Sequence, residues 1–330
     1  MKRKREKIDI ETYPAIRSPS TVLDIDLLDD LCDPQFIYDR DLDTTTEILQ
    51  VMLKKQEIYL LPLSKERSPE DKSEKWRAQI IQWFFDVVDH TEHDRSVVSL
   101  AVNILDRYVD IKAPSPIQNR RDYSLAAITC LMLGSKLYVS RHTRGCHISI
   151  PYILHLAKPA TYSKDDIEAL ERDILLSIRW LVHPPIVPEY IEHIFHLLPR
   201  WERDSMWRRK VIEQSRYAAE VTLMNDTLSP KSASIVTMLE RFSPARLAVA
   251  CVWWAIEYGV PEVKENSPTC SVRTVFWRNV VRSLCLTPSD VSIERNCVTQ
   301  NMLCILHLGI ATVGSKIQSE GDRIVRRRIL

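Results

Sequence analysis

Three residues that could bind a metal lie close together near the middle of the chain: His142, Cys146 and His147. Imidazole and thiolate groups are ligands that zinc prefers, and a closed zinc site needs four of them. No C-x-x-C pair accompanies these three residues, so neither the number nor the spacing of ligands fits. We therefore expect no metal and no other cofactor.

Motifs for nucleotide binding or covalent catalysis are also missing from the sequence. The chain holds six glycines among 330 residues, and none builds the glycine-rich loop with which Walker and Rossmann motifs hold phosphates. No pattern marks a Ser/His/Asp or Cys/His group, although a fold could assemble one from distant residues. We therefore expect a protein that acts by binding a partner and that is not an enzyme.

The net charge and the length of the apolar runs indicate which kind of partner the protein binds. A formal net charge of +1 gives no general attraction to DNA or RNA, whose partners usually carry a marked basic excess. No apolar run approaches the roughly 18 residues that span a bilayer. We expect a protein partner, in the nucleus or cytoplasm, where the eight cysteines would stay reduced thiols. The basic tip at Lys2–Lys7 suits either a nuclear localisation signal or a solvated chain end.

Apolar residues recur along the chain at the spacing of helices with one buried face. Ile80, Trp83, Phe84 and Val88 stand at i, i+3, i+4 and i+8, and the segment 97–108 repeats the pattern. With glycine so scarce, this predicts an all-α protein. Besides helices over these two segments and around 125–133, we expect an isolated amphipathic helix over 42–56 and further helices over 149–157, 163–178, 188–198, 206–223, 244–258, 271–284 and 289–308.

Two segments, Leu125–Leu133 and Leu247–Ile256, are apolar on nearly every side. A helix that is apolar all round must be buried all round. Each segment comes third in a set of five helices, which indicates an internal duplication and two tandem five-helix bundles, each with a buried central helix. We predict a disordered tail, a first domain with a preceding helix, a second domain and a basic tail, over 1–40, 41–182, 183–310 and 311–330 respectively.

One pair of opposite charges lies on the first two helices expected in the first bundle. Arg77 stands early in one helix and Asp106 late in the next, so antiparallel packing brings the two side chains together. Removing one partner of a partly buried pair leaves an uncompensated charge, at a cost of about 3–5 kcal/mol. We expect Arg77 and Asp106 to form a structural ion pair.

Three segments resemble the cyclin box in order, spacing and chemistry: WRAQIIQWFFDVV from Trp76, AVNILDRY over 101–108 and LMLGSK over 131–136. Three ordered motifs on three helices are far more specific than one short match. The resemblance implies a cyclin-like fold and a regulatory subunit that binds and activates a cyclin-dependent protein kinase, of cell-cycle type. A transcription-type cyclin and a cyclin-fold scaffold without kinase activation stay open as alternatives.

The resemblance also assigns a kinase-binding role to particular residues. Lys136 and Glu171 match the lysine and glutamate with which cyclins hold the kinase, and matching apolar positions surround them at Leu137, Leu175, Trp180 and Val182. From the residues alone, Lys136 and Glu171 could equally be solvated surface charges. The family's acidic pair after this lysine is absent, because Leu137 and Tyr138 stand there.

A second surface follows from the same resemblance. Trp76, Ile80 and Trp83 lie at i, i+4 and i+7 on one helix face and match the hydrophobic patch that docks Arg-x-Leu peptides. Asp86 matches the acidic residue that reads the basic side chain of such a peptide. The alternative is that Ile80 and Trp83 are core residues.

Overall fold

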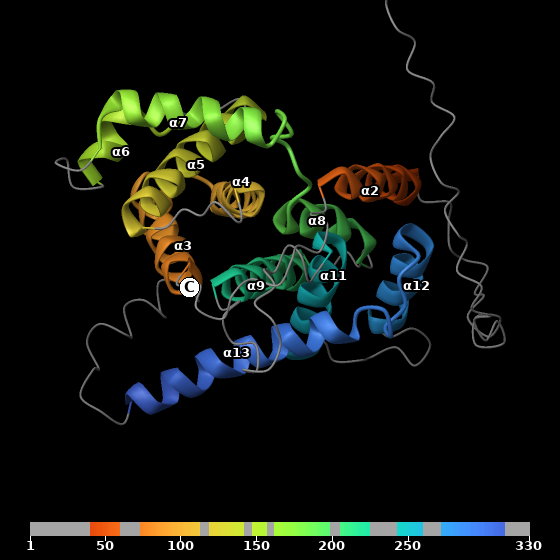
Figure 1. The fold of residues 1–330 in the computed structure, drawn as a ribbon. Helices are drawn as coiled ribbons and strands as arrows, with labels where there is room; N and C mark the ends of the chain where they lie inside the picture. The colour runs from red at the N-terminus through yellow and green to blue at the C-terminus, as the bar shows by residue number, and fades with distance from the viewer. Residues whose placement is uncertain are drawn as a thin grey trace, which may run out of the picture. The chain divides into compact units, whose positions relative to one another are not determined.

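The computed structural model describes residues 40–59, 73–112, 119–141, 147–156, 162–198, 205–224, 243–259 and 272–313. All regular structure in these ranges is helical, as the sequence predicts (Figure 1). The chain divides into a unit of residues Met1–Arg40 and a unit of residues Asp41–Leu330, which the description below concerns. The predicted N-terminal tail with its basic tip lies outside the described residues, except for Arg40. No described helix combines the length and the apolar character that crossing a bilayer requires.

The first bundle consists of α3 (Ser73–His90), α4 (Ser96–Lys112), α5 (Arg120–Arg141), α6 (Ile150–Leu156) and α7 (Lys164–Ser177). Helix α5 is its centre, because every residue from Ala126 to Ser135 is buried and the other four helices pack around it. This is the segment whose apolar side chains leave no polar face for solvent. The central position follows from that pattern.

Gly134 lies where α5 packs against α4. A Cβ atom built on it would stand 3.2 Å from the Cβ of Ala101 and 3.2 Å from the carbonyl oxygen of Val97. The second of these is a backbone atom, so a larger side chain would have to push the two helices apart. Gly134 therefore permits the close approach of α4, which offsets the helix propensity that glycine lacks.

Helix α7 begins with a capping box. The Ser163 hydroxyl accepts from the amide of Asp166 at 3.1 Å, and the Asp166 carboxylate accepts from the amide of Ser163 at 2.8 Å. These backbone and side-chain hydrogen bonds lower the pKa of Asp166. The N-cap predicted at Ser163 is thereby formed, and it fixes the start of the helix that carries Glu171.

The second bundle consists of α8 (Val187–Ile194), α9 (Ser205–Met224), α11 (Pro244–Trp254), α12 (Val272–Leu284) and α13 (Ser292–Val313). Helix α11 is central, with every residue buried except Arg246, and α8, α9 and α13 pack against it. A π-helical turn over Ala255–Gly259, which the sequence does not predict, continues α11. Near its start, the rings of Trp253 and Trp277 meet edge to face at 4.7 Å.

Two separate hydrophobic cores confirm the prediction of two tandem bundles with buried central helices. The boundaries expected at residues 40, 182 and 310 stay predictions. Arg95 links the bundles: its guanidinium pairs with Asp89 of α3 at 2.6 Å and with Glu220 of α9 at 2.5 Å.

Helix α2 (Arg40–Tyr59) packs on the second bundle, and is not isolated as the sequence suggests. Leu49 is fully buried in the second core, and the Gln56 side chain accepts from the Tyr190 hydroxyl at 3.1 Å and donates to Ser243 at 3.1 Å. At the other end, the hydroxyls of Thr46 and Ser283 share a hydrogen bond of 2.7 Å. Contacts with residues more than 130 positions away cannot be read from local spacing.

Leu49→Ala should lower the free energy of unfolding by about 2–5 kcal/mol, because it opens a cavity in the second core. The control is Val51→Ala on the same helix, whose side chain is 64% exposed and should cost less than about 0.5 kcal/mol. Urea denaturation followed by circular dichroism measures both. Equal midpoints for the two variants would show that α2 does not pack on the second core.

Candidate functional site

Helix α4 carries three consecutive residues whose side chains reach three different neighbouring segments. The first is Asp106, which the structure brings together with Arg77 of α3. The guanidinium donates from Nε to Oδ1 and from Nη2 to Oδ2, both at 2.9 Å. The two side chains are 8% and 3% exposed, so this is a buried, bidentate ion pair. It lies beside the central helix, where burial and the charge of Asp106 raise the pKa of Cys130.

The second is Arg107, to which the sequence assigns no role. Its Nη1 donates to the carbonyl oxygen of Leu181 at 2.6 Å, and its guanidinium carbon lies 5.1 Å from the ring centroid of Tyr59. Burial lowers the pKa of Arg107, and the nearby Tyr59 opposes that change. Arg107 thus joins α4 to the end of α2 and to the segment that follows α7.

The third is Tyr108, whose hydroxyl donates to Asp173 of α7 at 2.7 Å. Lys112 donates to the other oxygen of the same carboxylate at 3.0 Å. Burial raises the pKa of Tyr108, and the neighbouring carboxylate adds to that effect. Partial burial by itself would raise the pKa of Asp173, but the hydrogen bonds from Lys112 and Tyr108 lower it. These contacts fix the rotation of α7 against α4.

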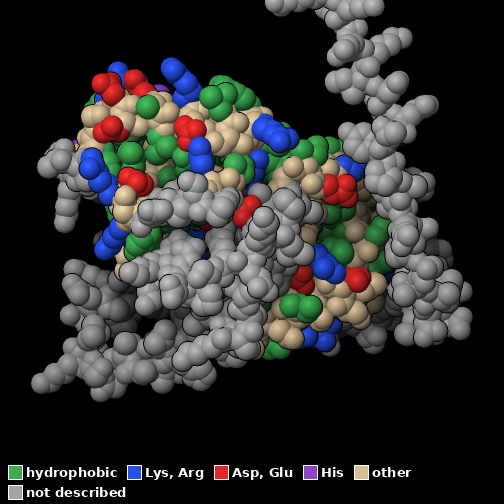
Figure 2. Space-filling view, in the orientation of Figure 1, with side chains coloured by type: hydrophobic (Ala, Val, Ile, Leu, Met, Phe, Trp, Pro, Cys, Tyr) green, Lys and Arg blue, Asp and Glu red, His purple; other side chains and the backbone are tan. Residues whose placement is uncertain are grey.

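Lys136 and Glu171, the two charges predicted to contact a kinase, bond to each other. The Lys136 ammonium donates to Oε1 of Glu171 at 2.8 Å and to Oε2 at 3.0 Å. The side chains are 35% and 20% exposed, so the pair lies at the surface, between the end of the central helix and α7. Charged side chains of both signs are spread over this part of the first bundle, with hydrophobic side chains exposed between them (Figure 2).

The four apolar residues predicted to surround this pair divide into two groups. Leu137, Leu175 and Val182 are half-buried and pack against the first core. Trp180 is 62% exposed, which is unusual for a side chain with so much apolar area. Trp180 is therefore the member of the set with the largest surface available to a partner.

Leu176 is an exposed apolar residue that the sequence analysis did not select, and 59% of it is accessible. The sequence around Leu176 contains a signal that could have indicated its exposure. Ile174, Leu175 and Leu176 are consecutive on α7 and together span about 200° around the helix axis, so one core cannot cover all three. Leu176 and Trp180 are thus both exposed apolar residues at the end of α7 or just after it.

The backbone after α7 turns sharply through two left-handed residues. Arg179 and Trp180 have φ values of 55° and 59°. Such angles are unfavourable for residues other than glycine, by about 1–2 kcal/mol each. The amide of Trp180 donates to the carbonyl of Leu175 at 2.8 Å and that of Leu181 to Ile178 at 3.1 Å, which satisfies carbonyls of the last helical turn.

The predicted docking patch lies on one face of α3. Trp76, Ile80 and Trp83 are half-buried and pack against the first core, and the rings of Trp76 and Tyr123 lie 5.8 Å apart. Asp86 is exposed and accepts from Gln82 at 3.0 Å. The three apolar side chains thus have a core role, and each keeps part of its surface accessible.

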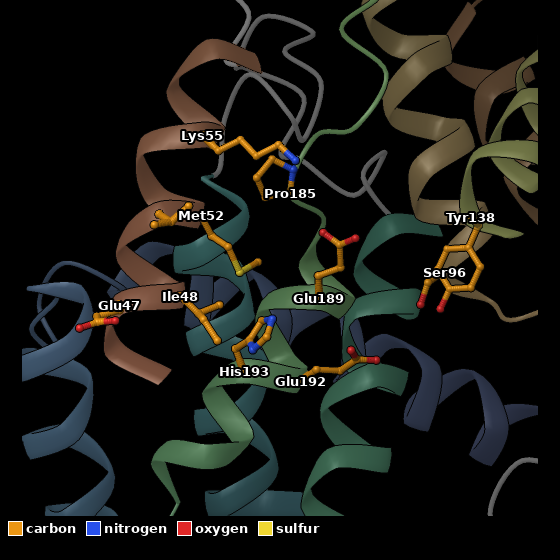
Figure 3. A pocket seen from close by; sticks show the side chains of 11 residues that line it. Glu47, Ile48, Met52, Lys55, Ser96, Tyr138, Pro185, Glu189, Glu192 and His193 are labelled. Carbon is orange, nitrogen blue, oxygen red and sulfur yellow. The ribbon is translucent and has the colours of Figure 1, made fainter. Parts of the chain in front are cut away.

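A cavity of about 560 Å³ lies between α2, α8 and the first bundle. In Figure 3 its residues from α2, such as Met52 and Lys55, face Tyr138 and Ser96 across Glu189, Glu192 and His193 of α8. Tyr138 follows Lys136 by two positions, and burial with the carboxylate of Asp94 raises its pKa. The lining mixes glutamates with apolar side chains, unlike a largely apolar ligand pocket.

Among the residues that the structure describes, no group of three or more His, Cys, Asp or Glu side chains could hold a metal ion. His147 is exposed, and His142 and Cys146 lie outside the described ranges. The geometry that is present offers a surface for binding: a paired lysine and glutamate beside half-buried and exposed apolar side chains.

Comparison with known proteins points to one family. Residues 47–183 match the family model of the cyclin N-terminal domain, a range that includes every residue predicted for the kinase contact, the docking patch and the structural ion pair. Cyclin-B1-1 of Arabidopsis thaliana is 28% identical over 172 residues, which are 51% of this chain and 36% of that protein. G2/mitotic-specific cyclin-B3 of Gallus gallus is 24% identical over 177 residues, which are 54% of this chain and 40% of that protein. The matches thus span less than half the length of these relatives.

The fold is similar to that of a viral cyclin from herpesvirus saimiri. The TM-score is 0.52 at 14% identity, and the superposition covers 79% of this chain and 96% of the viral protein. At this identity the likeness concerns the fold alone. It extends beyond the region that the family model matches, so the second bundle is part of the shared architecture.

Arg77→Met should lower the free energy of unfolding by about 3–5 kcal/mol, because it leaves the Asp106 carboxylate buried without its partner. The double variant Arg77→Met/Asp106→Leu should recover most of that loss, since no buried charge remains. Glu168→Ala, which breaks an exposed ion pair of 3.3 Å with Lys164, is the control and should cost less than about 0.5 kcal/mol. Chemical denaturation measures all three. If Arg77→Met lowered the free energy of unfolding no more than the control does, the buried ion pair would not have the structural role assigned to it.

Proposed function

We propose that this chain, which is a member of the cyclin family, is a regulatory subunit that binds and activates a cyclin-dependent protein kinase in control of the cell cycle. Members of the family are regulatory subunits and not enzymes. The relatives named above include a protein described as G2/mitotic-specific, which supports the cell-cycle type over the transcriptional one.

The observation that carries the proposal is the pairing of Lys136 with Glu171 at the surface of the matched domain. The structure places these charges 2.8 Å from each other, although they belong to two different helices. By resemblance, they match the lysine and glutamate with which cyclins hold the kinase. Trp180 and the half-buried Leu137, Leu175 and Val182 supply the apolar area that such a contact needs. Tryptophan is also among the residue types that most often carry the binding energy of an interface.

Activation then requires no catalytic group from this chain. Its helical face docks on the inactive kinase, turns the regulatory helix of the kinase inward and orders its activation segment. This aligns the lysine and glutamate of the kinase that hold ATP. The energy for the change comes from the difference between the affinities of this chain for the active and inactive kinase.

Two further parts of the proposal concern substrates and location. The exposed parts of Trp76, Ile80 and Trp83, with Asp86, form a docking patch for Arg-x-Leu peptides of substrates or inhibitors. We place the protein in the nucleus and cytoplasm, where cyclin-dependent kinases act.

Exchanging the two charges tests the kinase contact without removing the ion pair. Lys136→Glu/Glu171→Lys keeps an attractive pair within the chain, so stability should change by less than about 1 kcal/mol. The partner, however, meets each charge with the wrong sign, and we expect kinase binding to weaken at least about tenfold. Capture from cell extract, with assay of the captured kinase on histone, measures the effect.

The matched control is Lys164→Glu/Glu168→Lys, which exchanges an exposed ion pair at the start of the same helix α7. It should capture as much kinase activity as the wild type. Equal capture by the Lys136/Glu171 exchange would show that these residues are not the contact. If the wild type captures no cyclin-dependent kinase, the proposed function is wrong and a cyclin-fold scaffold becomes the better description.

Asp86→Asn tests the docking patch with little risk to the fold, because Asp86 is exposed. We expect about fivefold weaker binding of an Arg-x-Leu peptide, since a surface ion pair contributes up to about 1 kcal/mol. Kinase capture should not change. Fluorescence anisotropy of a labelled peptide measures the affinity, and a variant that binds as well as the wild type would exclude Asp86 from the patch.

A further inference from the structure

Arg107 is a buried charge whose contacts lie on segments distant from its own helix. The side chain belongs to the LDRY segment of α4, yet its guanidinium meets the carbonyl oxygen of Leu181 and the ring of Tyr59. Arg107 is only 4% exposed. A guanidinium is costly to hold away from water unless specific contacts compensate it. Its hydrogen bond to Leu181, at 2.6 Å, is therefore a strong local constraint on that segment.

The segment that Arg107 holds is the one with the unfavourable backbone. Arg179 and Trp180 are both left-handed, and Leu181 follows them directly. Left-handed angles in such residues persist only where surrounding contacts over-determine them. The turn has hydrogen bonds of its own, from the amides of Trp180 and Leu181. Arg107 adds a contact from outside the turn, on the carbonyl of Leu181.

The direction of Trp180 depends on this turn. A tryptophan on a freely moving segment would bury its ring against the nearest apolar surface, because that removes a large area from water. Here the ring stays 62% exposed, one residue before the carbonyl that Arg107 holds. The neighbouring Val182 is half-buried in the first core, so the chain is anchored on the far side of that carbonyl as well.

We propose that Arg107 is a positioning residue for the partner surface: it holds the left-handed turn at Arg179–Trp180 and thereby presents Trp180 to the kinase. The inference rests on the proposed function. The same guanidinium lies on the ring of Tyr59, so it also places the end of α2 relative to this turn. The kinase-facing end of α7 is therefore held by a residue of α4 that is itself buried.

The test compares Arg107→Met and Arg107→Lys with Tyr108→Phe in the full chain. Tyr108 is the next residue and also bonds to α7, but at Asp173, before the turn. Two quantities are measured: the hydrogen exchange rates of the Trp180 and Leu181 amides, and the dissociation constant for the purified cyclin-dependent kinase that the wild type captures. A general loss of stability would change these quantities in Tyr108→Phe as well as in the Arg107 variants. Loss of the turn would change them in the Arg107 variants alone.

We expect Arg107→Met to raise both exchange rates and the dissociation constant at least tenfold, and Arg107→Lys to give intermediate values. Tyr108→Phe leaves the ion pair of Lys112 with Asp173 to hold α7 against α4, so it should change neither quantity by more than about twofold. A second change, Arg179→Gly, should restore part of the affinity of Arg107→Met, because glycine adopts positive φ without strain. Arg179→Ala should not restore it.

Unchanged amide exchange in Arg107→Met would overturn the proposal, and so would an equal loss of affinity in Tyr108→Phe. If Arg107→Met does not fold, Arg107→Lys decides by the same two measurements. If the wild type captures no kinase, the proposed function fails by itself, and the exchange rates still decide whether Arg107 holds the turn.

Discussion

The first bundle depends on one buried ion pair, between Arg77 and Asp106. Both charges are almost removed from water, and each is stabilised there by the two hydrogen bonds that Arg77 donates to Asp106. The pair fixes α3 against α4 in rotation as well as in distance, since a bidentate contact allows one geometry. That constraint sets the direction of every other side chain on α4, among them Arg107 and Tyr108.

Consecutive residues of a helix point about 100° apart, and α4 uses this to reach three neighbours from one turn. Asp106 faces α3, Arg107 meets the segment after α7 and the end of α2, and Tyr108 bonds to α7 itself. The proposed binding surface lies on the end of α5, on α7 and on the segment after α7. The geometry of this surface thus depends on the contacts that α4 makes beneath it, and packing in the apolar cores holds the helices in place.

The sequence predicted the parts of this structure that local periodicity determines. Helices α3 and α4 show a stripe with a 3.6-residue repeat, and the central helices α5 and α11 are apolar on nearly all sides, which leaves a buried position as the only stable one. The placement of α2 was missed, because an amphipathic helix shows which face is apolar but not which core covers it. The π-helical turn after Trp254 was missed as well, since nothing in the local residue types marks it.

At the site, the residues could be selected by resemblance, but their contacts could not. Spacing places Arg77 and Asp106 on adjacent helices, and the structure has them paired. Whether Lys136 and Glu171 meet depends on how α5 packs on α7, which the sequence does not show.

The ion pair of Lys136 with Glu171 affects the free energy of binding a partner in two ways. An exposed pair of this kind contributes at most about 1 kcal/mol to stability, so exchanging it for contacts with a partner costs little. It also holds both side chains in place beforehand, which reduces the entropy lost when a partner binds. The mutual ion pair is therefore compatible with the proposed kinase contact.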